Sequence, residues 1–212
     1  MKEPASHDET RRWLVRTILV APIALASPSL LGLTRCSSGP NVSTVRSPTP
    51  ACSDGDDDEA TEAQTEGPFF KTNSPERTSL IEAGVQGTRL LLTGSVITRS
   101  CRPVAGALID FWQADDSGNY DNVTFRLRGH QFTDAQGAYQ LDTIVPGLYP
   151  GRTRHIHVKA QAPGQSILTT QLYFPGESRN ASDGIFDADL LVDMTATASG
   201  REGRFNFVLD IA

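Results

Sequence analysis

The chain has 212 residues, of which 38% are hydrophobic and 21% are charged, and its net charge is −6 at pH 7. This apolar content is enough for the core of one ordinary domain with tails, and the charge is too low for a wholly disordered chain. Residues 36–65 carry one basic and six acidic side chains, whereas residues 66–212 carry thirteen and sixteen. A near-neutral body excludes the basic face of a nucleic-acid-binding protein. Three cysteines exclude a disulfide-built miniprotein and a CxxC-type zinc site.

Residues 1–36 have the pattern of an export signal. Arg11 and Arg12 precede a charge-free, largely apolar run over residues 17–34. Paired arginines before such a run are typical of twin-arginine signals, which an export receptor reads. We therefore expect export from a bacterial cell, either as a secreted protein or into the cell envelope, with Ala26 as one candidate for the cleavage position.

Attachment of the N-terminal region to a membrane stays open at this point. The apolar run just reaches the minimum length of a transmembrane span, so a mature anchor is one alternative. Residues 33–36 also resemble a lipoprotein cleavage box in which Cys36 would carry a lipid, although Arg35 stands where a small residue is expected.

Residues 37–64 are predicted to form a flexible linker. They are rich in Ser, Pro, Thr and acidic residues, with an acidic run at 54–59. A segment of this composition cannot bury enough apolar surface to become ordered. The spacing of an EF-hand calcium loop is absent. The predicted organisation is therefore an export signal at 1–36, a linker at 37–64 and one domain at 65–212.

The domain at 65–212 has the pattern of an all-β protein. Short apolar or alternating runs are separated by turn signals, and no window of helical length carries a sustained 3.6-residue stripe. Many short strands with frequent turns predict an antiparallel β-sandwich. The predicted strands are Thr88–Ile97, Ala107–Trp112, Ala138–Thr143, Arg154–Ala160, Leu168–Phe174 and Arg204–Asp210.

Histidine and tyrosine gather in the middle of this domain. His155 and His157 lie two residues apart in a predicted strand, so both imidazoles point to one face and can meet one metal ion. Tyr149 lies in the Pro/Gly turn just before them, and Tyr120 follows another glycine turn. Two imidazoles and two phenolates favour a hard, highly charged cation and stabilise Fe(III) over Fe(II). Hydrogen-bonded histidines and packing tyrosines are the non-metal alternative, and His130 is interpreted as a structural or supporting residue.

Several ordered blocks within residues 65–190 resemble the intradiol ring-cleavage dioxygenases, a family that includes catechol 1,2-dioxygenase and protocatechuate 3,4-dioxygenase. The likeness is to the exported branch, in which a small catalytic domain follows a signal. The family fold, a β-sandwich, agrees with the strand pattern. The blocks are Thr65–Phe70, Gly106–Trp112, Gly118–Asp121, Arg128–Asp134, Pro146–Pro150 and His155–His157.

The resemblance implies a role for each matching residue. It implies one ferric ion, Fe(III), bound by four side chains, namely Tyr120, Tyr149, His155 and His157. Arg152 matches the family's active-site arginine and would supply a fixed cation for developing negative charge. Gln171 matches the glutamine on the strand after the histidines, which could hydrogen-bond a ligand. Tyr149 matches the ligand that leaves the metal when substrate binds and takes a proton from the substrate.

The activity that the resemblance implies is oxidative cleavage of a catechol ring by O2 between the two hydroxylated carbons, giving a muconate-type diacid. The segment between Tyr149 and His155 is shorter here than in the named intracellular enzymes, so the substrate, its pocket and the oligomeric state stay open. Arg126, Arg128 and Arg154 could receive a substrate carboxylate or could be solvated charges. The alternatives are a secreted non-catalytic β-sandwich binding module and a zinc or copper hydrolase.

A disulfide between Cys52 and Cys101 is predicted because the chain is expected to be exported. Cys52 lies just before the domain and Cys101 lies at a predicted strand end. Closing a loop of this length stabilises by about 4 kcal/mol in the chain-entropy model.

Overall fold

The computed structural model describes residues 59–211. The predicted signal, Cys36, Cys52 and most of the predicted linker lie outside the described residues, so the predictions about them stay predictions. Within the described part of the chain, no helix is both long enough and apolar enough to span a membrane.

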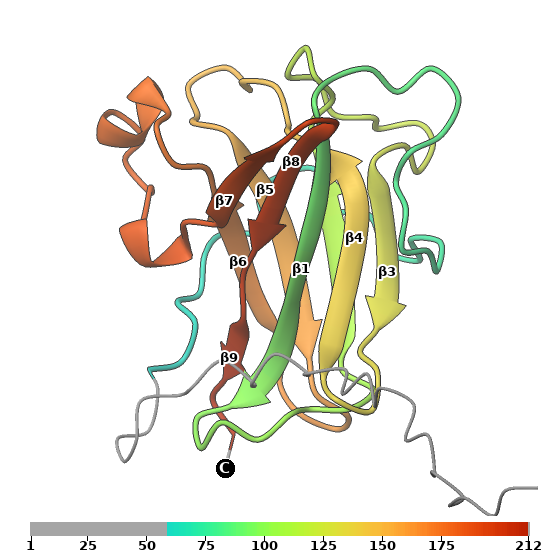
Figure 1. Ribbon diagram of the computed structural model, residues 1–212, viewed down its shortest axis with the longest axis vertical. Helices are drawn as coiled ribbons and strands as arrows, with labels where there is room; N and C mark the ends of the chain where they lie inside the picture. The colour runs from blue at the N-terminus through green and yellow to red at the C-terminus, as the bar shows by residue number, and fades with distance from the viewer. Residues whose placement is uncertain (1–58, 212) are drawn as a thin grey trace, which may run out of the picture. The chain divides into compact units, whose positions relative to one another are not determined.

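The described residues form two β-sheets, which Figure 1 shows as two layers. The first sheet has the spatial order β4 (Ala138–Ile144), β1 (Arg89–Thr98), β8 (Gly200–Arg204) and β7 (Asp193–Thr197), and β9 (Phe207–Leu209) also pairs with β1. The second sheet has the order β3 (Arg128–Phe132), β2 (Leu108–Gln113), β5 (His155–Gln161) and β6 (Leu168–Tyr173). Two short 3₁₀ helices, η1 (Ser178–Ala181) and η2 (Ala188–Leu190), connect β6 to β7. The all-β prediction is confirmed.

The sheet containing β1 differs from the antiparallel prediction, because β1 pairs in parallel with both β8 and β9. The strand predicted over 204–210 is also split in two at residues 205–206. At the break, the Phe205 carbonyl oxygen approaches Gly94 so closely that a Cβ on this residue would lie only 1.7 Å from the oxygen. The side chain of Asn206 accepts a hydrogen bond from the Ser95 N–H. A glycine in β1 therefore allows the chain to cross close to it and to continue as β9.

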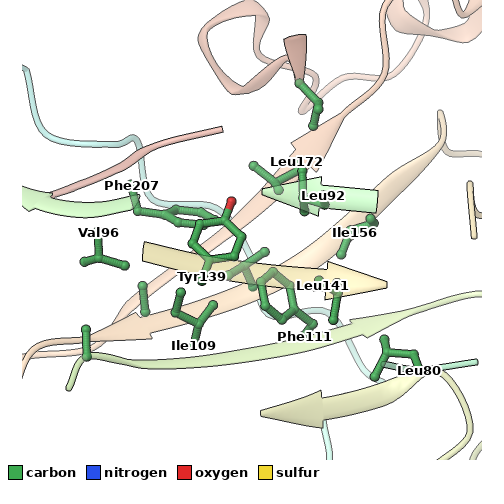
Figure 2. Packing of buried hydrophobic residues seen from close by; sticks show 14 of the residues in the cluster. Leu80, Leu92, Val96, Ile109, Phe111, Tyr139, Leu141, Ile156, Leu172 and Phe207 are labelled. Carbon is green, nitrogen blue, oxygen red and sulfur yellow. The ribbon is translucent and has the colours of Figure 1, made fainter. Parts of the chain in front are cut away.

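The core lies between the two sheets, as Figure 2 shows. Alternation along β5 turns Ile156 and Val158 into this core and leaves His155 and His157 on the other face. The second sheet thus has one apolar face for stability and one polar face for chemistry. The core residues drawn and labelled in Figure 2 are Leu80, Leu92, Val96, Ile109, Phe111, Tyr139, Leu141, Ile156, Leu172 and Phe207.

The end of the predicted linker is attached to the domain. Thr61 N–H donates to the Val208 carbonyl (2.9 Å), and Gln64 N–H donates to the Thr169 carbonyl (2.8 Å). Further along, Glu76 forms a β-bridge with His130. The structured domain therefore starts at least a few residues before residue 65, because the strand edges supply partners for backbone groups that composition alone could not predict.

Candidate metal centre

Strand β5 presents the two histidines side by side. The rings of His155 and His157 have centroids 4.8 Å apart and planes 82° apart, and both side chains are buried. Trp112, opposite His157 in the β2–β5 register, stacks on its ring at 4.9 Å with an interplanar angle of 5°. The alternation predicted from the sequence is confirmed, and Trp112 restrains one of the two imidazoles.

Two tightly packed glycine turns bring the two tyrosines to the histidines. A Cβ on Gly118 would lie 2.3 Å from the Leu148 carbonyl oxygen, and one on Gly147 would lie 2.3 Å from the backbone nitrogen of Gly118. Only glycines allow the turns to approach this closely. As a result, the rings of Tyr120 and Tyr149 meet edge to face, with centroids 5.7 Å apart.

The four predicted ligand residues converge at one place on the polar side of the second sheet. Tyr120 Oη lies 3.0 Å from His155 Nε2, and its ring centroid is 6.0 Å from that of His157. His155 Nδ1 lies 2.7 Å from the Thr153 carbonyl oxygen, so Nδ1 carries the proton and Nε2 keeps its lone pair toward Tyr120. Phe69 stacks on Tyr120 at 4.5 Å and covers it from the N-terminal segment.

Burial sets the protonation of these groups. Desolvation lowers the pKa of His155 to about 4 and holds the pKa of His157 well below its usual value, so both imidazoles are neutral at pH 7. Desolvation also raises the pKa of the Tyr120 phenol, while the positive charges of Arg152 and Arg128 act in the opposite direction. The phenol therefore keeps its proton unless a cation takes the proton's place.

The donor set fits a ferric ion. Within residues 59–211, no three His, Cys, Asp or Glu side chains gather to hold a metal. The oxygen donors beside the two imidazoles are the phenols of Tyr120 and Tyr149. His157 Nδ1 is buried without a hydrogen-bond partner among residues 59–211. Burial lowers the pKa of the ring, and the Thr65 backbone acts in the opposite direction. A buried neutral imidazole beside phenols is a typical metal-ligand environment, and two phenolate oxygens match a hard trivalent cation.

Arg152 and Gln171 lie beside this cluster in one hydrogen-bonded network. Arg152 Nη2 donates to Gln171 Oε1 (2.8 Å) and more weakly to the Tyr173 hydroxyl (3.3 Å). Gln171 Nε2 donates to the Thr65 carbonyl (2.9 Å), which fixes the orientation of the amide. Gln171 is buried and faces His157 in the β5–β6 register. The structure thus brings together all six residues that the resemblance placed in the site.

Other candidates from the sequence lie elsewhere. His130 Nδ1 lies 3.1 Å from the Ser74 hydroxyl, which donates to Asp110, and this trio contacts none of the four rings. Arg154 pairs with Glu177 (3.0 Å). The contacts of His130 agree with its interpretation as a structural or supporting residue.

Arg128 is neither solvated nor available to a substrate carboxylate. Its side chain is 1% exposed, and it donates to the carbonyls of Phe69 (2.5 Å) and Asp121 (2.8 and 3.1 Å). Arg128 thereby connects the segment of Phe69, whose ring stacks on Tyr120, to Asp121, which follows Tyr120 in the sequence. The sequence contains no local signal for this role, because both acceptors are backbone groups and one is 59 positions away.

Comparison with known proteins agrees with the fold and the site. A family model described as "Dioxygenase" matches residues 65–211. The chain therefore belongs to the intradiol ring-cleavage dioxygenase family, whose members typically use non-haem Fe(III) and act on catechols with O2.

The individual relatives align with only part of this chain. The chain is 31% identical over 153 residues to a chlorocatechol 1,2-dioxygenase from Rhodococcus opacus, covering 58% of this chain and 60% of that protein. It is 36% identical over 118 residues to a protocatechuate 3,4-dioxygenase beta chain from Burkholderia cepacia, covering 47% of this chain and 50% of that one. The chain thus spans about half to three-fifths of the length of these curated relatives.

Among solved structures, one similar protein is the dioxygenase domain of a dioxygenase–carbohydrate-binding protein fusion from Streptomyces sp. SirexAA-E. The TM-score is 0.71 with 58% identity, and the match covers 73% of this chain and all of that one. An intradiol ring-cleavage dioxygenase from Tetranychus urticae has a TM-score of 0.66 with 25% identity, covering 72% of this chain and 94% of that one.

Proposed function

We propose that this protein is a non-haem Fe(III) dioxygenase that cleaves a catechol-type ring between its two hydroxylated carbons. One carbon–carbon bond breaks, and both oxygen atoms of O2 enter the product, which is a muconate-type diacid. The observation that carries the proposal is the convergence of two phenols and two neutral imidazoles beside one arginine.

In this proposal a ferric ion is held by Tyr120, Tyr149, His155 and His157. The ion would act as a Lewis acid that binds the catechol as a dianion and makes its ring reactive toward O2. The His155 Nδ1–Thr153 hydrogen bond and the Trp112 stack hold the two imidazoles in place. Phe69 covers one face of the Tyr120 ring.

Two further side chains would act on the substrate. Tyr149 is only half-buried and lies on the Pro/Gly turn, so as a phenolate its Oη could move and accept the proton of one catechol hydroxyl, becoming a neutral phenol, while the second proton would pass to solvent. Arg152 contributes a guanidinium whose orientation is fixed by its partners, and a fixed cation stabilises negative charge as it develops on the ring oxygens.

The experiment loads the full chain with Fe(III) and measures O2 uptake over a panel of substituted catechols, with product identification under isotopically labelled O2. The proposal predicts a ring-opened diacid that carries both labelled oxygen atoms. Tyr120→Phe should abolish turnover, whereas Tyr139→Phe removes a core hydroxyl that bonds only the Phe205 carbonyl and serves as the matched control. A folded, iron-loaded protein that consumes no O2 with any catechol would favour the binding-module alternative.

We also propose that export uses the twin-arginine route, because that route carries folded proteins and would allow iron to be loaded before transport. Replacing Arg11 and Arg12 by Lys should keep active enzyme inside the cell. An exported double variant with full iron content would contradict this proposal.

A further inference from the structure

The connection between β6 and β7 makes several hydrogen bonds to the residues just before the ligand histidines. Asp183, which follows η1, accepts hydrogen bonds through Oδ2 from Arg152 Nε (2.8 Å) and from the Thr153 backbone N–H (2.8 Å). Its other oxygen accepts from the Ile185 N–H (3.2 Å). The Asp183 side chain is only 3% exposed. One buried carboxylate therefore holds two consecutive residues at the edge of the site.

The hydrogen bonds of Arg152 show what this carboxylate achieves. A guanidinium has five N–H donors in a rigid fork. Arg152 uses Nε on Asp183, and its Nη2 lies within reach of Gln171 and Tyr173. No acceptor for Nη1 is present among the residues that the structure describes. The bonds on one edge thus fix the plane of the guanidinium and leave Nη1 available for an anionic oxygen.

Thr153 connects the same carboxylate to a metal ligand. Its N–H donates to Asp183, its hydroxyl donates to Asn180 Oδ1 (2.6 Å), and its carbonyl accepts the proton of His155 Nδ1 (2.7 Å). Asn180 is in turn tied to the Phe174 carbonyl (2.9 Å). The position of the Thr153 carbonyl, and with it the orientation of the His155 ring, therefore depends on the β6–β7 connection.

Asp183 remains ionised in this setting. Burial alone would raise its pKa, but the Thr153 N–H and the Arg152 guanidinium lower it overall. A buried ion pair is weak evidence for stability, because its desolvation offsets much of its attraction. Such a pair beside a catalytic cluster is better explained by the geometry that it imposes.

We propose that Asp183 is a positioning residue for the ring-cleavage reaction: it fixes the guanidinium of Arg152 toward the bound catechol and, through Thr153, orients His155. This inference rests on the function proposed above. Asp183 touches neither ligand atoms nor substrate in this scheme, and its effect passes through its two neighbours.

The test begins with a measurement that does not depend on activity. In Asp183→Ala, both side-chain oxygens are removed, so Arg152, the Thr153 N–H and the Ile185 N–H all lose their acceptor. We expect the Thr153 backbone N–H to exchange with solvent at least about 10-fold faster in the full-length metal-free variant, as measured by hydrogen exchange. The control Asp134→Ala removes a similar N–H acceptor at the β3–β4 turn and should leave Thr153 unchanged.

The second part uses the iron-loaded full chain. Asp183→Ala should retain iron but lower kcat/KM by about 10- to 100-fold, the usual effect of losing a residue that orients a metal-site side chain. In an Arg152→Ala background, the same substitution should lower kcat/KM by a smaller factor than in the wild-type background, because one of the two residues through which Asp183 acts is gone.

Two results would overturn the inference. One is unchanged Thr153 exchange in Asp183→Ala, and the other is a loss in the double variant equal to the product of the two single losses. If the wild-type chain shows no ring cleavage, the proposed function fails, yet the exchange measurement still decides whether Asp183 fixes Thr153.

Discussion

The buried histidines make the stability of the metal-free protein depend on pH. The unfolded chain protonates its histidines near pH 6.5, whereas burial lowers the pKa of His155 to about 4 in the folded state. The unfolded state therefore binds more protons between these two values. The contribution of His155 to the free energy of unfolding is fully present above pH 6.5 and is lost as the pH falls toward 4.

The size of this loss follows from the two pKa values of His155. Between pH 7.5 and pH 5.0 the free energy of unfolding should decrease by about 2 kcal/mol because of His155 alone. His157, whose pKa is also well below its usual value because of burial and the nearby His155, should add to the loss.

The assay is urea unfolding of the metal-free full chain at a series of pH values. His155→Gln should remove the His155 contribution to the change of the unfolding free energy with pH, whatever the effect of this substitution on absolute stability. Burial raises the pKa of the Asp110 carboxyl, which changes stability with pH in the opposite direction, so the comparison with His155→Gln isolates the histidine contribution. An unfolding free energy that stays constant from pH 7.5 to pH 5.0 would refute the claim that the two imidazoles are buried and neutral.

Three further predictions follow from the sequence and the structure. Tyr149→Phe should fold and bind iron through the remaining three ligands, with altered visible absorption and slow turnover in a stopped-flow assay; wild-type colour and rate would make Tyr149 a packing residue. Gly94→Ala should destabilise the domain by several kcal/mol in urea unfolding, because the new Cβ meets the Phe205 carbonyl at 1.7 Å; an unchanged midpoint would contradict the β1 crossing. Mass spectrometry of the non-reduced exported protein should find Cys52 linked to Cys101, and free thiols at both positions would exclude the pair.

Strands with strong alternation were predictable from the sequence. The predicted bounds of β2 and β5 differ from the observed ones by one residue at each end, because their apolar positions face the core. The strands β3, β7 and β8 were not predicted. They are rich in charged, small or polar residues, and most side chains of β7 and β8 are exposed, so their pairing comes from neighbouring strands and not from their own pattern.

The residues of the site also divide into those that the sequence could predict and those that it could not. Tyr120, Tyr149, His155 and His157 could be found because they lie in motifs that resemble a family. The role of Asp183 could not be found, because it depends on contacts about 30 positions back along the chain and its neighbours in sequence form only short 3₁₀ turns. Residues that hold a site through backbone groups leave no spacing pattern in the sequence.

The most direct measurement for the proposed metal centre is a titration of the metal-free full chain with Fe(III), followed by visible absorption. Ligation by phenolates predicts a coloured complex that saturates at one ion per chain, loses most of its colour in Tyr120→Phe and keeps it in Tyr139→Phe. A colourless complex, or a colour that is unaffected by Tyr120→Phe, would contradict a ferric centre built from these two tyrosines and two histidines.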